Sequence, residues 1–292
     1  MKFLSSDWGG LSWTPWFAFA DAPAFRQLPD KAGLYRIRAR ELGELFYIGE
    51  TGRNVRERLG DLRRNTLSVE MPFNDPHTAA PSLWAWHDAE GYEFECSASP
   101  VVFTDHLEEA RKRREGLEFY LLWQYRLEFG SSTRCNHGRF HLRYTKSTDR
   151  KKNVRGSRQL DHLVDNGVGG ESFLPLQERG VPSDDDWMGL IWSRPEPLGK
   201  GLHRELSMLP GVYKIFDGQT NDLLYVGETS NLRQRLTDHA RKNWQCQTPL
   251  FSWVQLPERI PSYQRREIEN DLLGGFYAQA HTMPAFQLIG HH

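Results

Sequence analysis

Two short stretches of the sequence decide the fold, and each occurs twice. The first copy has Gly33-Leu34-Tyr35-Arg36-Ile37 and then Phe46-Tyr47-Ile48-Gly49-Glu50-Thr51. The second copy has Gly211-Val212-Tyr213-Lys214-Ile215 and then Leu224-Tyr225-Val226-Gly227-Glu228-Thr229, each residue 178 positions after its counterpart. Short stretches rich in apolar and aromatic residues, separated by a turn, predict an antiparallel hairpin in each copy.

The similarity between the two copies extends on both sides of the hairpins. Upstream, residues 7–13 match residues 186–192, and both segments begin with Asp-Trp and end with Trp. Downstream, residues 114–118 match residues 265–269, and both end in Glu. The interval between the copies is much longer than the repeat of a solenoid, so we interpret the sequence as a duplicated globular domain.

We expect two domains of class α/β, more narrowly α+β, and the 292 residues are enough for each to bury its own core. The first domain covers residues 1–144 with its Trp-rich lead-in, residues 145–185 form a basic and polar linker, and the second domain covers residues 186–292. Each domain is predicted to hold a three-stranded, mainly antiparallel sheet flanked by helices. The predicted helices cover residues 108–129, 231–239 and 263–280, and the candidate third strands lie at residues 84–86 and 252–254.

The composition excludes several classes of protein. The three cysteines, Cys96, Cys135 and Cys246, are far apart, which argues against a disulfide framework or a zinc ribbon and predicts a cytoplasmic location. No apolar run is long enough to span a bilayer, and the first residues lack the pattern of a signal peptide. A net charge of −1 excludes a protein that coats DNA through overall basicity.

One region departs from this balance of charge. Between Arg134 and Arg158 the sequence has nine basic residues against the single acid Asp149. We expect five of them to bind nucleic acid: Arg150, Lys151, Lys152, Arg155 and Arg158. The alternative is a solvated, flexible linker without a ligand, and the charge alone does not separate the two interpretations.

In each copy Gly-x-Tyr, Tyr-x-Gly, an Arg-Leu pair and a later Glu follow one another in the same order. This combination resembles the GIY-YIG nuclease superfamily, whose small α/β domains hydrolyse phosphodiester bonds with the help of a divalent metal. The resemblance covers the core of both copies. It leaves out the Trp-rich lead-ins, the insertion at residues 70–108 and the basic region.

The resemblance implies catalytic roles for matching residues of both copies. Tyr35 and Tyr213 match the first-motif tyrosine, which acts as the general base or its partner near the attacking water. Tyr47 and Tyr225 match the second-motif tyrosine beside the active-site phosphate. Because tyrosine has a reference pKa of about 10, it needs a nearby cation, metal-bound hydroxide or histidine to work at neutral pH.

The helices supply the remaining groups that the resemblance implies. Arg58 and Arg235 match the arginine that clamps the scissile phosphate, where a bidentate guanidinium neutralises charge. Glu118 and Glu269 match the single metal-binding glutamate. One glutamate with several waters suits Mg²⁺, or Mn²⁺ in its place.

The two copies differ at two of the implied positions. His239, four residues after Arg235, matches a histidine that helps to deprotonate the tyrosine, whereas the first copy has Leu62 there. Asn136 matches a late asparagine near the phosphate, and Gln287 stands at the corresponding position, 18 residues after the glutamate in both copies. Neither copy has the lysine that some members place after the second-motif glycine.

The resemblance therefore implies a metal-dependent endonuclease that acts on DNA, with RNA left open as a substrate and no membrane partner. Two sites in one chain would form an intramolecular pseudo-dimer, so the chain is expected to work as a monomer. The alternative is a nucleic-acid-binding protein in which one or both copies are inactive, as the missing histidine of the first copy suggests. Each glutamate also has a simpler interpretation, an ion pair with Arg114 or Arg265 one helical turn earlier.

Overall fold

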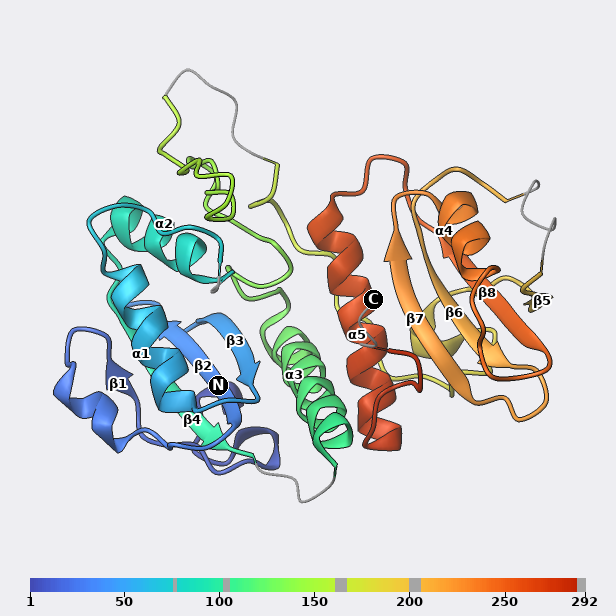
Figure 1. The fold of residues 1–292 in the computed structure, drawn as a ribbon, viewed down its shortest axis with the longest axis horizontal. Helices are drawn as coiled ribbons and strands as arrows, with labels where there is room; N and C mark the ends of the chain where they lie inside the picture. Colours follow the sequence, from blue (N-terminus) through green and yellow to red (C-terminus); the bar gives the residue numbers. More distant parts are fainter. Residues whose placement is uncertain (76–77, 102–105, 161–166, 200–205, 288–292) are drawn as a thin grey trace. The chain divides into compact units, whose positions relative to one another are not determined.

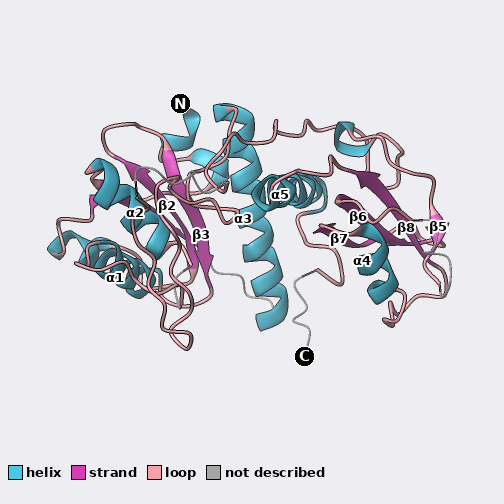
Figure 2. Ribbon diagram, turned by 90° about the horizontal axis from the view of Figure 1, so that it is seen from above, coloured by secondary structure: helices cyan, strands magenta, loops and turns pink. Residues whose placement is uncertain are grey.

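The computed structural model describes residues 1–75, 78–101, 106–160, 167–199 and 206–287. The chain divides into two compact units, which we call unit 1 (residues 1–172) and unit 2 (residues 173–292). Figures 1 and 2 show that each unit combines an antiparallel sheet with helices, which confirms the predicted α+β class. In the described part of the chain, no helix is both long and apolar enough to cross a bilayer.

The sheets of the two units have the same order and the same register. Unit 1 has the order β1-β4-β2-β3, formed by Phe17–Ala18, Phe94–Pro100, Gly33–Ala39 and Leu45–Thr51. Unit 2 has the order β5-β8-β6-β7, formed by Glu196–Pro197, Pro249–Gln255, Gly211–Asp217 and Leu223–Thr229. Each sheet adds a two-residue strand, β1 or β5, to the three strands expected. Tyr35 pairs with Gly49 and Tyr213 pairs with Gly227, so the strands align both motifs in the same way.

The helices follow the strands in the predicted order. Unit 1 has α1 (Val55–Thr66), α2 (Ala80–Glu90) and α3 (Leu107–Phe129), and unit 2 has α4 (Leu232–His239) and α5 (Ser262–Ala280). Helices α1 and α4 begin at equivalent caps, because the side-chain oxygens of Asn54 and Asn231 accept bonds from the backbone N–H three residues later. This shared start places the arginine and the residue four positions after it on the same face of each helix.

The expected strand at residues 84–86 was wrong, because these residues lie in helix α2. The sequence alternates Trp-Ala-Trp, but Trp84 and Ala85 are both buried, which a half-exposed strand would not allow. The helix ends at Gly91, whose φ of 70° is left-handed. The third strand of unit 1 is β4, whereas the strand expected at residues 252–254 lies in β8.

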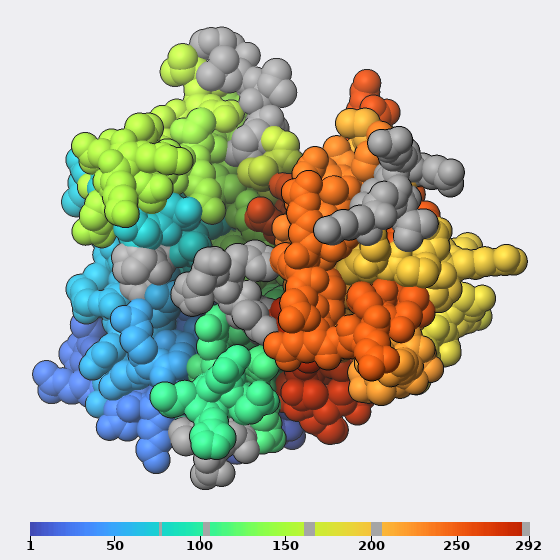
Figure 3. Space-filling model, turned by 45° about the vertical axis from the view of Figure 1, so that its right-hand side comes forward, coloured from blue at the N-terminus to red at the C-terminus, as the bar shows by residue number. Residues whose placement is uncertain are grey.

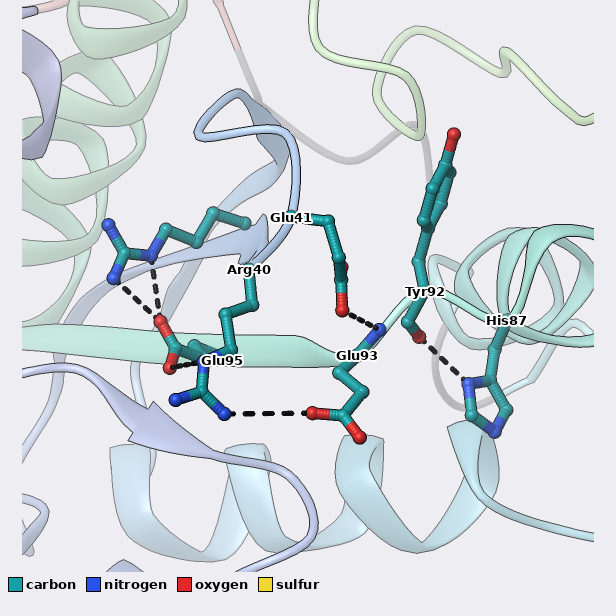
Figure 4. Close-up of polar contacts among 7 residues, drawn as sticks. Arg40, Glu41, His87, Tyr92, Glu93 and Glu95 are labelled. Carbon is teal, nitrogen blue, oxygen red and sulfur yellow. Dashed lines mark hydrogen bonds and ion pairs between the residues drawn. The ribbon is translucent and has the colours of Figure 1, made fainter.

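Strands β2 and β4 are tied by charged pairs at the end near helix α2. Arg38 donates to Glu95 at 2.6 and 2.8 Å, and the register places these two residues opposite each other. Figure 4 shows Arg40 reaching Glu93 and Glu95, with its nearest nitrogens 3.7 Å from each carboxylate. In the same view His87 Nδ1 lies 2.8 Å from the carbonyl oxygen of Tyr92, which fixes the turn between helix and strand.

A buried cation holds the Trp-rich lead-in of unit 1 against its sheet. Arg36 alternates with Tyr35 along β2 and points to the opposite face. Its guanidinium donates to the carbonyl oxygens of Phe3 at 2.5 Å and Ser5 at 2.8 Å, and it lies 4.3 Å from the ring of Trp13. Carbonyl oxygens and an aromatic face thus replace the water that this charge loses on burial.

Unit 2 uses a lysine for the same task. Lys214 Nζ donates to the carbonyl oxygens of Pro182 at 2.7 Å and Asp184 at 2.8 Å, and it lies 4.4 Å from the ring of Trp192. Trp192 Nε1 donates to the carbonyl oxygen of Trp187 at 3.0 Å. Trp8 and Trp13 in unit 1 and Trp187 and Trp192 in unit 2 are buried, so these tryptophans cover the core.

Residues 143–159, which overlap the start of the predicted linker at residues 145–185, form a hairpin on unit 1 that we call the basic hairpin. Its two arms are joined by Thr145 N–H to the carbonyl of Ser157 and by Gln159 N–H to the carbonyl of Arg143. The hydroxyl of Tyr144 donates to Asp88 of α2 at 2.6 Å. Its ring joins a small core with the buried residues Met71, Trp84, Ala85 and Phe140. The hairpin is therefore packed against α2 rather than being a free connection.

Replacing Lys214 with Met is expected to remove a pH dependence of stability between pH 8 and 10.5. Burial lowers the pKa of Lys214 from 10.5 to about 8, so in this window the unfolded chain holds a proton that the folded chain has released. Raising the pH therefore stabilises the wild-type fold, by up to about 3 kcal/mol. Urea unfolding at pH 8 and pH 10 measures the difference, with exposed Lys151→Met as the matched control. An equal rise in the free energy of unfolding from pH 8 to pH 10 in Lys214→Met would contradict the lowered pKa of Lys214.

Candidate active site

The functional side chains of unit 2 come from four elements. They are Tyr213 on β6, Tyr225 and Glu228 on β7, Arg235 and His239 on α4, and Arg265 and Glu269 on α5. Gly227 makes room for both tyrosine rings, since a Cβ atom there would lie 2.4 Å from the Tyr213 hydroxyl and 2.8 Å from Tyr225 Cε1. The ring centroids of Tyr213 and Tyr225 are 6.0 Å apart and nearly parallel. The second-motif glycine is thus required by close approach of the rings.

The hydroxyl of Tyr213 lies between a donor and an acceptor. Arg235 Nε donates to it at 3.0 Å, and it lies 2.8 Å from His239 Nε2. Since the arginine can only donate, the hydroxyl can give its proton to the histidine when Nε2 is the unprotonated ring nitrogen. Burial raises the pKa of Tyr213 well above its usual value, and the charge of Arg235 works against this rise. The arrangement suits transfer of the tyrosine proton to a buried base.

The histidine is itself held by its surroundings. His239 is fully buried at the end of α4, and its carbonyl oxygen accepts a bond from Trp244 Nε1 at 3.0 Å. Its ring lies 5.1 Å from that of Tyr225 and 5.4 Å from that of Trp244. Trp244 was missed at the sequence level, because it belongs to the loop after α4 and to no part of the repeat.

Unit 1 repeats this geometry without the histidine. Arg58 Nε donates to the Tyr35 hydroxyl at 3.4 Å, and the rings of Tyr35 and Tyr47 are 6.0 Å apart. A Cβ atom on Gly49 would lie 2.6 Å from the Tyr35 hydroxyl. Leu62, fully buried in the core, stands where unit 2 has its histidine. Unit 1 therefore holds the tyrosines and the arginine but no imidazole at this position to take the proton.

The glutamate of α5 lies beside a second carboxylate. Glu269 Oε1 accepts a bond from the backbone N–H of Glu228 at 3.3 Å. The side chain of Glu228 is in turn held by Arg265, whose Nε lies 2.7 Å from its Oε2. Burial, and then the charge of Glu228, raise the pKa of Glu269 to about 7.

Unit 1 has the equivalent pair. Arg114 Nε lies 2.7 Å from Glu50 Oε2, and burial together with Glu50 and Glu115 raises the pKa of Glu118 well above its usual value. Arg114 thus bonds Glu50, as Arg265 bonds Glu228, instead of the glutamate one turn later on its own helix. These Glu–Arg pairs were missed at the sequence level, although both members occur in both copies.

The donor set fits a divalent cation that keeps most of its water. Among the residues that the structure describes, no three His, Cys, Asp or Glu side chains gather into a metal-binding group. Glu269 in unit 2 and Glu118 in unit 1 would each offer one carboxylate, with a second carboxylate close by. Two neighbouring carboxylates repel each other, and a hydrated Mg²⁺ or Mn²⁺ would relieve that repulsion.

Asn136 and Gln287 bind the edge strands. Asn136 Oδ1 accepts from the backbone N–H of Ile48 at 3.0 Å, and its Nδ2 donates to the carbonyl of Ile48 at 2.8 Å. Gln287 Oε1 accepts from the N–H of Val226 at 3.0 Å. Ile48 and Val226 each follow a second-motif tyrosine, so the amides fix the strands that carry Tyr47 and Tyr225. The extra methylene of Gln287 leaves this function intact.

The five basic residues expected to bind nucleic acid lie on the basic hairpin of unit 1 and are exposed there: Arg150, Lys151, Lys152, Arg155 and Arg158. Arg155 differs from the others because it makes an ion pair with Glu70 at 3.1 Å and lies 4.3 Å from the ring of Phe73. These basic side chains are therefore exposed on a folded hairpin.

Binding of Mn²⁺ to unit 2 is expected to strengthen as the pH rises from 6 to 8. The pKa of Glu269 is about 7, so below this pH a proton competes with the cation, and affinity should fall by about tenfold per unit. Calorimetry in a Glu118→Gln background isolates unit 2, and Glu269→Gln is the control that should remove binding. Equal affinity at pH 6 and pH 8 would contradict this role for the carboxylate.

Comparison with known proteins finds a match to one protein family, and this match lies within unit 2. Residues 209–265 match the model of the GIY-YIG catalytic domain. The match contains Tyr213, Tyr225, Arg235 and His239, and it ends four residues before Glu269. No curated protein and no solved structure matches the chain. The match supports a place for the core of unit 2 in the GIY-YIG nuclease superfamily.

Proposed function

We propose that the chain is a divalent-metal-dependent endonuclease that hydrolyses phosphodiester bonds in DNA, with unit 2 as its principal catalytic site. The observation that carries this proposal is the Tyr213 hydroxyl, bonded by Arg235 at 3.0 Å and by His239 at 2.8 Å. A proton acceptor and a neighbouring positive charge each help a tyrosine to act as a base near neutral pH. Unit 2 supplies the two together.

Each side chain of unit 2 has a defined task in this reaction. Tyr213 passes its proton to His239 Nε2, and its oxygen then takes a proton from the attacking water. Arg235 stabilises the phenolate and the negative charge that develops on the phosphate. Tyr225, parallel to Tyr213, binds the scissile phosphate through its hydroxyl. Glu269 would hold Mg²⁺ or Mn²⁺, which supplies Lewis-acid stabilisation of the leaving oxygen.

Unit 1 is, in the same proposal, a second copy of this domain that binds a strand and cleaves it far more slowly. The equal strand order and the matching pairs Tyr35–Gly49 and Tyr213–Gly227 support a common origin. Buried Leu62 favours the slower reaction, because Tyr35 loses the acceptor that His239 provides. The two units of one chain would then act as a pseudo-dimer of unequal halves on one nucleic acid.

The basic hairpin supports a nucleic-acid substrate. Arg150, Lys151 and Lys152 are exposed at its tip, where they would contact phosphates without reading sequence. Unit 1 thus contributes the binding surface and unit 2 the faster site.

Purified protein is expected to nick supercoiled plasmid with Mg²⁺ or Mn²⁺, and EDTA should abolish the reaction. Glu269→Gln should slow nicking by at least about 100-fold, because it removes the carboxylate that would bind the cation. Glu118→Gln, the matched change in unit 1, should retain most of the nicking rate. Gel electrophoresis of a time course measures both. Full activity of Glu269→Gln would contradict a catalytic role for unit 2, and rapid linearisation by the wild type would mean two equally active sites.

A further inference from the structure

The basic hairpin and the segment between α1 and α2 line an open pocket on unit 1. Its volume is about 490 Å³, and its walls include Val69, Phe73, Arg150 and Arg155. Figure 3 shows the yellow-green hairpin lying against the cyan segment, and Asn74 N–H donates to the hairpin carbonyl of Thr148 at 3.0 Å. Unit 2 passes from α4 to β8 through residues 240–248, so its described residues contain no equivalent segment. The pocket is therefore a feature of unit 1.

Arg155 forms a fixed, flat surface in this pocket. Its Nη1 donates to the carbonyl oxygen of Met71 at 2.5 Å, and its Nε lies 3.1 Å from Glu70 Oε2. One face of the guanidinium lies on the ring of Phe73, with Cζ 4.3 Å from the centroid. The side chain still exposes 42% of its area. A guanidinium whose plane is fixed in this way is suited to stack with a planar ring on its outer face.

On its hairpin side the pocket is bordered by basic residues, while Glu70, which is paired with Arg155, lies in the opposite wall. The backbone N–H of Arg150 donates to Asp75 at 2.7 Å, and that of Lys152 donates to Asp149 at 2.8 Å, so the hairpin tip is held in place. The side chains of Arg150, Lys151 and Lys152 are exposed. Arg150 Cζ lies 5.9 Å from the Phe73 centroid, which makes the charged rim continuous with the stacked pair. Such a surface complements a ligand that has a planar ring next to phosphates.

We infer that this pocket seats the base of one unpaired nucleotide on Arg155, while Arg150, Lys151 and Lys152 bind the adjoining phosphates. The inference rests on the proposed function only in that the ligand is a nucleic acid. A base inside a duplex has both faces covered by its neighbours, so the pocket accepts only a nucleotide in a single-stranded end, flap or gap. Unit 1 thereby directs the chain to junctions between duplex and single strand.

The test compares two ligands in EDTA, where no cleavage occurs: a blunt duplex and the same duplex with a single-stranded extension. Fluorescence anisotropy with the full chain measures both affinities. Arg155→Lys keeps the charge and loses the flat surface, so it should weaken binding of the extended duplex by about tenfold and change the blunt duplex by less than about twofold. Arg179→Lys, an exposed arginine of unit 2, is the matched control and should change neither.

Three further variants separate the contribution of stacking from those of charge and folding. Phe73→Tyr keeps the ring beneath Arg155 and should behave as the wild type, whereas Phe73→Leu should reproduce Arg155→Lys. Lys151→Gln with Lys152→Gln should weaken both ligands alike and reduce the salt dependence of binding. Thermal unfolding of each variant checks that the hairpin remains folded.

A 2-aminopurine base in the extension reports stacking directly. Its fluorescence should be quenched on binding to the wild type and to Phe73→Tyr, and quenching should be lost with Arg155→Lys. Equal weakening of both duplexes by Arg155→Lys, or no quenching with the wild type, would overturn the inference. Plasmid nicking distinguishes the two proposals, because a chain that nicks normally but never quenches the probe keeps its nuclease function and lacks this pocket's role.

Discussion

The catalytic arrangement depends on the pairing of Tyr213 with Gly227 across strands β6 and β7. With no side chain at Gly227, the rings of Tyr213 and Tyr225 lie over the strand. Helix α4 then starts at the Asn231 cap, which sets Arg235 and the residue one turn later against the same hydroxyl. A shift of one residue in this register would turn Tyr213 to the opposite face of the sheet. Gly227 leaves room for the rings, and the bond from the Val226 N–H to Gln287 Oε1 holds the edge strand β7 in this register.

The same scaffold gives two different sites because one buried position differs. In unit 2, His239 fills the space beneath the tyrosine, with its Nε2 2.8 Å from the Tyr213 hydroxyl. In unit 1, Leu62 fills that space with hydrocarbon, so the Tyr35 hydroxyl keeps its contact with Arg58 but gains no base there. The core accommodates either histidine or leucine at this position, since both side chains are buried. The chemistry differs, because leucine cannot accept a proton. Unit 1 carries instead the basic hairpin and its pocket, which favours a division into binding and cleavage.

The parts of the fold that follow local pattern could be predicted from the sequence. The hairpins containing Tyr35 and Tyr213 and the helices at residues 108–129, 231–239 and 263–280 fall on stretches that recur in both copies. Residues 84–86 were misassigned because a short apolar run fits a buried helix as well as a strand. The tertiary position of the run, against the hairpin ring of Tyr144, selects the helix. That contact lies about 60 residues away in sequence, beyond any local pattern.

The sequence predicted which single side chains lie at the candidate site, but it did not predict which of them form ion pairs. The tyrosines, the arginines and His239 lie together as the motif order suggested. The pairing of Glu228 with Arg265 could not be predicted, because the alternative partner one helical turn away looked equally suitable. The basic run likewise gave no sign that residues 143–159 fold into a hairpin. Its bonds to Asp75 and Asp88 depend on the tertiary structure of the insertion.

The nicking rate of His239→Leu in a Glu118→Gln background, where unit 2 acts alone, tests whether the bond between Tyr213 and His239 takes part in the reaction. This substitution gives unit 2 the residue that unit 1 already accommodates at the equivalent buried position. Loss of a positioned base typically costs 10²- to 10⁴-fold, so the account predicts a decrease of about 100-fold or more with little change in Mn²⁺ affinity. A nicking rate equal to that of the parent would contradict it, because the bond between Tyr213 and His239 would then have no part in the reaction.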